Sequence, residues 1–293
     1  MESISKIQGT DTDGPAQVGS WGRPAGKTIG FPNSATIAQI WNTPLVVEIG
    51  HSHGKQALQN GYSGLYAPAA NMHRSPFNGR NYEYYSEDSF LSGEMCGSAV
   101  QGIEEMGVYV YIKHFICNDG EAGIYRDAVY TWMTEQALRE IYLRAFETAV
   151  KEGGAYSVMS TYGGLNGIWT ASNFDLLTTI LRDEWGFTGT VMTDWWAKIN
   201  EEGESGSKSQ TVPMVRAQND IYMVTADAAS NSNKDNTAEG LADGRLTRAQ
   251  LMRNAANICC FLLRSVAMER LLGREEEECT ELHSPVSTEG AGD

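Results

Sequence analysis

The sequence is short of cysteine and of long apolar runs. Its 293 residues include only five cysteines, and no two of them are spaced as Cys-x-x-Cys. An odd count without that spacing argues against a disulfide framework or a thiolate metal site, and reduced thiols indicate a cytoplasmic protein. No run of about 18 apolar residues occurs, so we expect no membrane span. Residues 1–14 are polar and lack the apolar core of a secretory signal.

Positive charge is also scarce. The chain has 22 lysines and arginines against 37 aspartates and glutamates, which gives a formal net charge of −15. An acidic surface disfavours nucleic acid and anionic membranes as partners and suits a soluble protein that handles neutral ligands. Much of the excess could equally serve solubility alone. With 41% hydrophobic residues, the composition is that of an ordinary globular protein.

Short apolar runs alternate with amphipathic segments along the chain. We expect strands at 65–68, 108–115, 156–162, 189–195 and 221–225, and helices at 86–106, 134–151, 173–185 and 248–268. Ser172 with Asp175, and Thr247 with Gln250, have the spacing of capping boxes.

This alternation implies an α/β fold with a parallel sheet covered by helices. At this chain length, a (β/α)8 TIM-like barrel, which need not be complete, is favoured over an open doubly wound sheet. We expect the barrel domain to span residues 1–272. A Gly-, Ser- and Glu-rich loop is expected at 201–210, and an acidic disordered tail at 273–293.

Polar and aromatic residues stand where three of the predicted strands end. Lys113 and His114 lie near the end of VYVYIKHF, Tyr162 ends YSVMSTY, and Asp194 and Trp195 follow GTVMT. In a (β/α) barrel these ends converge on the face that carries the active site. Aromatic rings would stack on a sugar, and Asp194 beside Lys113 would have a lowered pKa and act as a nucleophile. A proton-transfer enzyme would show a similar pattern.

A set of longer blocks makes the interpretation more specific. They are DGP at 13–15, RSPFNGRNYEYYSED at 74–88, KHF at 113–115 followed by Arg126, EQALREIYLRAFE at 135–147, VMSTYGGLNG at 158–167 and LRDEWGFTGTVMTDWW at 181–196. In this order the blocks resemble glycoside hydrolase family 3, and the resemblance covers most of the chain from residue 13 to about 268.

The resemblance implies a retaining hydrolase that removes terminal β-D-glucosyl residues through a covalent glycosyl-enzyme intermediate on Asp194. The substrate would be a β-glucoside or an oligosaccharide, with no cofactor and no metal. By position in the motifs, the residues that bind the sugar or line its pocket would be Asp13, Arg80, Lys113, His114, Met159, Tyr162 and Trp195, with Arg126 as a weaker match.

Each of these residues also has a simpler structural interpretation. Asp13 before Gly-Pro could begin a turn. Arg80 could lie on a surface loop, and Lys113 with His114 could form a structural pair. The His-x-His motif at 51–53 lies on a predicted helix and is more often structural than metal-binding. Asp194 could cap a helix, and the remaining three could be packing residues: Met159, Tyr162 and Trp195.

The acid/base residue of the family's chemistry is not identifiable in this chain. Two-domain members carry it as a glutamate on an α/β sandwich domain, and barrel-only members use a histidine in the loop after KHF. The loop here, ICNDGEAGIYRD, contains no histidine. Glu83, Glu87 and Asp88 are interpreted as residues that hold a loop and begin a helix, with no proton-transfer role.

The late segment of the chain resembles members in which the sandwich domain precedes the barrel. The alternatives to an active enzyme are therefore a non-catalytic sugar-binding fragment, or a subunit that needs a partner sandwich domain. Either alternative predicts an exposed docking patch or self-association.

Overall fold

The computed structural model describes residues 9–19, 28–121, 126, 129–265 and 268. The acidic tail predicted at 273–293 lies outside these residues. No helix in the described ranges is both long and apolar enough to cross a membrane.

Parallel strands form the centre of the molecule. One sheet has the order β1 (Asp11–Asp13), β2 (Gly64–Tyr66), β3 (Tyr109–Val110), and a second has the order β4 (Ile112–Phe115), β6 (Ser157–Ser160), β9 (Thr190–Met192). All of these neighbours pair in parallel. Only Tyr111 separates β3 from β4, and a parallel bridge joins Ala69 to Lys113, so the two sheets follow one another along the chain. The class is α/β, as predicted.

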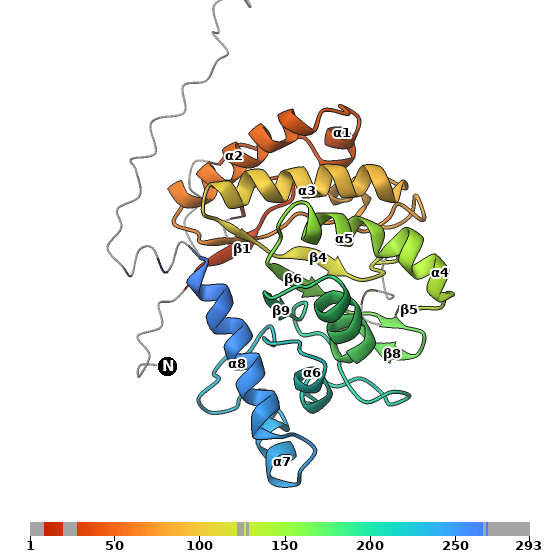
Figure 1. Cartoon of the computed structure of the whole chain (residues 1–293), viewed down its shortest axis with the longest axis vertical. Helices are drawn as coiled ribbons and strands as arrows, with labels where there is room; N and C mark the ends of the chain where they lie inside the picture. Colours follow the sequence, from red (N-terminus) through yellow and green to blue (C-terminus); the bar gives the residue numbers. More distant parts are fainter. Residues whose placement is uncertain (1–8, 20–27, 122–125, 127–128, 266–267, 269–293) are drawn as a thin grey trace, which may run out of the picture.

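The described residues form eight α-helices, some of which pack against the strands. They are α1 (Ser34–Ala38), α2 (Thr43–Gln59), α3 (Ser89–Glu105), α4 (Glu135–Ala137), α5 (Arg144–Lys151), α6 (Val212–Arg216), α7 (Thr237–Ala242) and α8 (Arg248–Leu263), with π-helical turns at Leu138–Tyr142 and Asp175–Glu184. In Figure 1, α2, α3 and α5 lie one beside the next along the strands, and α2 packs on α3 and α3 on α5. Gly102 permits the close approach of α2 and α3, because a Cβ there would lie 2.2 Å from the Val47 carbonyl oxygen.

Two helix starts follow the sequence signals. The Asp88 carboxylate accepts a hydrogen bond from the Leu91 N–H at 2.8 Å and caps α3, in line with its interpretation as a helix-starting residue. Thr247 and Gln250 form the expected capping box of α8. Both caps satisfy backbone N–H groups that have no partner within the helix.

Three local expectations were wrong. The segment 221–225 contributes only a bridge between Ile221 and Met192 instead of a strand. Ser172 does not form a capping box, because its hydroxyl donates to the Trp169 and Asn200 carbonyl groups while the Asn173 side chain accepts from the Leu176 N–H at 3.0 Å. Helix α8 ends at Leu263, before the predicted residue 268.

A small third sheet follows the ends of β4 and β6. It has the order β5 (Tyr130–Thr131), β7 (Gly164–Leu165), β8 (Ile168–Trp169), and the pair β7–β8 is antiparallel. Its turn is made by Asn166 and Gly167, which both have positive φ and suit a tight hairpin. The 3₁₀ turns η2 (Asn81–Glu83) and η5 (Thr170–Ser172) complete the connections around the strand ends.

Candidate active site

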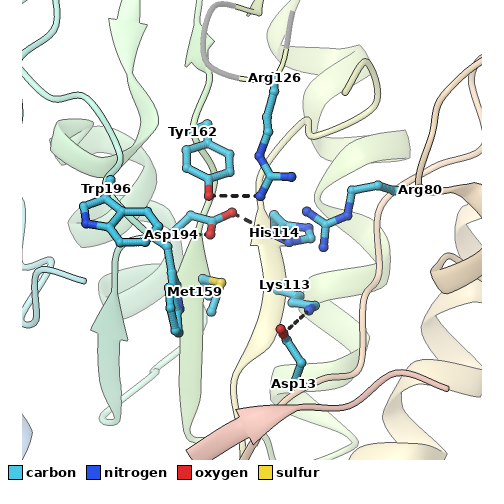
Figure 2. Close-up of a pocket in the computed structure, with 10 residues that line it drawn as sticks. Asp13, Arg80, Lys113, His114, Arg126, Met159, Tyr162, Asp194 and Trp196 are labelled. Carbon is cyan, nitrogen blue, oxygen red and sulfur yellow. Dashed lines mark hydrogen bonds and ion pairs between the residues drawn. The ribbon is translucent and has the colours of Figure 1, made fainter. Parts of the chain in front are cut away.

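A cavity of about 170 Å³ lies at the carboxyl ends of the parallel strands. It is lined by Asp13, Arg80, Lys113, His114, Arg126, Met159, Tyr162, Asp194, Trp195 and Trp196. The eight side chains expected from the sequence therefore all line one cavity, together with Arg126. Figure 2 shows that the labelled side chains come from different elements, with Asp194 near the middle of the group.

Asp194 follows β9 by two residues and is 5% exposed. Its Oδ1 accepts a hydrogen bond from the Trp195 N–H at 2.7 Å, whereas its buried Oδ2 has no hydrogen-bond partner among the described residues. Burial raises the pKa of this carboxyl, and the Trp195 N–H and the charges of Arg80 and Lys113 oppose that effect. Lys113 does act to lower this pKa, but the expected net decrease was wrong, because desolvation outweighs the nearby cations.

His114 lies in β4 with its Nε2 atom 3.7 Å from Asp194 Oδ2. Burial lowers the pKa of this imidazole well below its usual value, and the charges of Arg80, Lys113 and Arg126 act in the same direction. The ring is therefore neutral at neutral pH, and its contact with Asp194 is not an ion pair.

Asn71 holds the backbone of His114 from both sides. The Asn71 Nδ2 group donates to the His114 carbonyl at 2.8 Å, and the His114 N–H donates to Asn71 Oδ1 at 2.7 Å. The ring nitrogen Nδ1 of His114 lies 3.4 Å from the same oxygen. Sequence reasoning missed Asn71, and its only signal was a polar side chain a few residues after the predicted strand at 65–68.

Two buried glutamates balance the cations of the cavity. Arg80 Nε donates to Glu83, and Arg80 Nη1 donates to Glu121 Oε2 at 2.7 Å. Arg126 Nε lies 3.3 Å from Glu121 Oε1, and Lys113 Nζ lies 3.6 Å from Glu83 Oε2. The glutamate side chains are 3% and 1% exposed, so their charges act at low local dielectric.

The structure places Glu83 as the sequence interpretation described it, as a residue that holds the loop of Arg80. Glu121 was not singled out, although it belongs to the same loop as Arg126. Asp13, at the end of β1, is the second carboxylate that lines the cavity, and its Oδ1 lies 3.3 Å from Lys113 Nζ.

Tyr162 lies between Arg126 and Asp194 (Figure 2). Arg126 Nη2 donates to the Tyr162 hydroxyl oxygen at 3.2 Å, and the guanidinium carbon lies 5.0 Å from the centroid of the tyrosine ring. Burial raises the pKa of this phenol, and the charge of Asp194 adds to the increase. Tyr162 therefore keeps its proton, and a hydrogen bond between its hydroxyl and the Asp194 carboxylate raises the pKa of Tyr162 and opposes the increase in the pKa of Asp194.

An aromatic wall closes the side of the cavity formed by the residues after β9. The Trp195 ring packs edge-on against Trp196, with centroids 5.6 Å apart, and against Tyr66 at 6.2 Å. Trp196 is half exposed and has a positive φ of 58°, a conformation that is uncommon outside glycine. Sequence reasoning did not single out Trp196, although the DWW block contains it.

The cavity thus combines charged hydrogen-bonding groups, an aromatic wall and one buried carboxylate oxygen without a partner. Such a lining can bind a polar ring by its hydroxyl groups and apolar face, and can present a nucleophile to it. Among the described residues that line it, the other carboxylate, Asp13, is ion-paired with Lys113.

Comparison with known proteins gives a consistent result. Residues 16–260 match the family described as glycosyl hydrolase family 3 N terminal domain. The chain is 45% identical over 299 aligned residues to a β-glucosidase of Ruminococcus albus, a match that covers 100% of this chain and 30% of that protein.

Solved structures of β-glucosidases are similar in fold. The enzyme of Paenibacillus barengoltzii aligns with a TM-score of 0.85 and 45% identity over 89% of this chain and 28% of that one. The β-glucosidase 3B of Thermotoga neapolitana, in complex with glucose, aligns with a TM-score of 0.81 and 37% identity over 92% of this chain and 37% of that one. The chain therefore spans about a third of the length of these relatives.

Proposed function

The chain belongs to glycosyl hydrolase family 3, and on that basis we propose that it is the catalytic barrel of a retaining β-glucosidase. Six parallel strands follow one another in chain order, β1, β2 and β3 in one sheet and β4, β6 and β9 in the next, which supports a (β/α)8 TIM-like barrel, complete or incomplete. The names of the relatives support terminal β-D-glucosyl residues as the substrate class.

The observation that carries the proposal is the environment of the Asp194 carboxylate. Its Oδ2 atom is buried and has no hydrogen-bond partner among the described residues, and the residue lines the cavity. In the proposed reaction this oxygen attacks the anomeric carbon, and the bond from that carbon to the leaving oxygen breaks with its electron pair. Water then hydrolyses the glycosyl ester, which gives retention of configuration.

The other cavity residues bind the sugar in this proposal. Asp13, Arg80, Lys113 and His114 would hold hydroxyl groups of the glucosyl ring, since they supply donors and acceptors on one side of Asp194. Tyr162 would approach the anomeric region, and the sugar would lie against Met159 and Trp195, two of the hydrophobic residues of the lining. No cofactor and no metal takes part.

The proton donor to the leaving group would come from outside the described residues. The cavity lining described here offers Asp13 and Asp194 as carboxylates, and Asp13 is already paired with Lys113. We propose that a sandwich domain on a longer chain or a separate subunit supplies it, because the chain spans only 30% of the Ruminococcus albus relative. A sugar-binding fragment without turnover is the second candidate, and the same missing donor favours it.

The location proposed for the protein is the reducing cytoplasm. Four cysteines lie in the part of the chain that the structure describes, and each is a free thiol: Cys96, Cys117, Cys259 and Cys260.

The test uses a 2,4-dinitrophenyl β-glucoside, whose leaving group needs no protonation. The chain should release dinitrophenolate, and Asp194→Ala should fall to the rate of the reaction in buffer. Azide added to that variant should give an inverted glycosyl azide. The matched control is Asp183→Ala, which replaces an exposed aspartate in the π-helical turn before β9 and should keep full activity.

Three outcomes distinguish the candidates. Equal turnover by the native chain and Asp194→Ala would refute the nucleophile assignment. Glucose binding in calorimetry without any turnover of the dinitrophenyl substrate would favour the sugar-binding fragment. For alkyl glucosides, a gain of roughly 10²–10⁴-fold on adding the unmatched part of the Ruminococcus albus relative would identify the missing proton donor.

A further inference from the structure

Glu121 joins two arginines that reach the cavity from different parts of the chain. Its side chain is 1% exposed, and its two oxygens face Arg80 Nη1 at 2.7 Å and Arg126 Nε at 3.3 Å. Asn118 Nδ2 donates to Oε2 at 3.3 Å. A carboxylate buried to this degree is stable only when charged or polar partners surround it.

The charges around Asp194 nearly cancel. Three cations, Arg80, Lys113 and Arg126, are joined by ion pairs to three anions, Asp13, Glu83 and Glu121. His114 is neutral because burial lowers its pKa. Among the described residues of this ion-pair network the formal charges therefore sum to zero, and Asp194 itself gives the cluster a formal charge of −1.

We infer that Glu121 is a positioning residue that holds both arginines in place and cancels their charge, so that Asp194 reacts in an electrically balanced site. This inference rests on the proposed function of Asp194. Attack on the anomeric carbon passes through a transition state with positive charge on the sugar. An uncancelled cation in the site would oppose that charge and would also stabilise ionised Asp194 against reaction.

Glu121 and Asp194 also affect one another directly. The pKa of Glu121 is raised, mainly by burial; the two arginines oppose this increase and the charge of Asp194 adds to it. Removal of the Glu121 charge should therefore lower the pKa of Asp194. Among the described residues, the titratable and charged groups around the pair are Asp13, Arg80, Glu83, Tyr84, Lys113, His114, Arg126 and Tyr162.

The test follows covalent trapping by 2,4-dinitrophenyl 2-deoxy-2-fluoro-β-D-glucoside. Oδ2 of Asp194 forms a bond to the anomeric carbon while the bond to dinitrophenolate breaks, and the phenolate leaves with the electron pair, so no proton is transferred. Intact-protein mass identifies the adduct, and the trapping rate is measured against pH. Circular dichroism confirms that each variant is folded.

In Glu121→Gln, the acidic limb of the pH–rate profile for trapping should shift to lower pH by about one unit. The maximal trapping rate should fall about tenfold. Arg126→Gln removes one cation and should move the limb upward. The double variant Glu121→Gln/Arg126→Gln restores the balance and should return the limb toward the native position. Glu121→Asp keeps the charge and should keep the native limb.

The matched control is Glu184→Gln, a carboxylate paired with Arg139 on the surface, which should trap like the native chain. A native limb in Glu121→Gln, or a double variant shifted further than either single one, would overturn the inference. If Glu121→Gln does not fold, an unshifted limb in Arg126→Gln overturns it. Failure of the native chain to form an adduct at Asp194 would refute the proposed function, and the inference with it.

Discussion

Replacement of Asp119 by asparagine should change the stability of the protein in opposite directions at low and high pH. Asp119 lies in the loop after β4, and its Oδ1 accepts a hydrogen bond from the Met72 N–H at 2.9 Å. Its Oδ2 is buried without a hydrogen-bond partner in the described ranges. Burial raises the pKa of this carboxyl to about 7, against the effects of the Met72 N–H and the Arg74 charge.

The size of the effect follows from this pKa. The folded chain holds the Asp119 proton up to about pH 7, whereas the unfolded chain releases it near its model value of 3.8. Between these values the folded state binds more protons, so the free energy of unfolding falls as pH rises. About three pKa units at 1.36 kcal/mol each correspond to a loss of about 4 kcal/mol.

Asp119→Asn removes the charge and keeps the oxygen that accepts from Met72. The new amide N–H would be buried without a partner, which costs about 1–3 kcal/mol at every pH. The variant should therefore be less stable than the native chain near pH 4.5 and more stable near pH 8. Urea unfolding followed by tryptophan fluorescence at both pH values measures the two differences.

The difference between the variant and the native chain isolates the contribution of Asp119 to the pH dependence of stability, because the other buried groups titrate in both proteins. Asp183→Asn, at an exposed position, is the control and should follow the native pH dependence. If Asp119→Asn loses stability with rising pH as steeply as the native chain does, the assignment of a charged, poorly solvated Asp119 is refuted.

Three further predictions follow from single contacts. Arg80→Lys cannot reach two carboxylates with one ammonium group, so glucose affinity should fall about ten- to a hundredfold in calorimetry. Asn71→Ala leaves the buried N–H and carbonyl of His114 without partners and should lower the free energy of unfolding by about 3 kcal/mol in urea. Burial lowers the pKa of His53 to about 4, so this side chain by itself should contribute a loss of about 3 kcal/mol as pH falls from 6.5 to 4. In thermal unfolding, the stability of His53→Leu relative to the native chain should therefore rise by about that amount over the same pH range.

Each of these has a result that would contradict it. Unchanged glucose affinity in Arg80→Lys would show that the two ion pairs do not position the guanidinium for the sugar. An Asn71→Ala variant as stable as the native chain would mean that water replaces both hydrogen bonds. If His53→Leu loses stability in acid as the native chain does, another group is responsible for that loss.

The sequence predicted the strand ends of the site because the signal there is local. Buried strands appear in a sequence as continuous apolar runs. A change to polar residues predicts where the strand ends, as near His114 and Asp194. In parallel strands these ends share one side, so residues far apart in the chain could be expected in one cavity. The residues that only the family motifs indicated line the same cavity: Asp13, Arg80 and Met159.

The partners of these residues could not be predicted in the same way. Glu121 lies 41 residues from Arg80, and Asn71 lies 43 residues from His114, so neither pairing leaves a periodic signal. The pKa of Asp194 was predicted with the wrong sign because sequence shows a neighbouring lysine but not the extent of burial. The segment 221–225 has the composition of a strand, yet only Ile221 pairs with β9, because pairing depends on a neighbour and not on the segment alone.

The site therefore divides two tasks between different parts of the fold. The strands β1, β4, β6 and β9 aim side chains at the cavity, and the loops that carry Glu83 and Glu121 neutralise the cations among them. Buried charges without partners would cost several kcal/mol each, so neither Lys113 on β4 nor Arg80 on the loop after β2 could remain there without Glu83 and Glu121. Asp194 Oδ2 is then left as a carboxylate oxygen of the cluster with no hydrogen-bond partner among the described residues. In the proposed reaction, the sugar would therefore meet a nucleophile that is already desolvated.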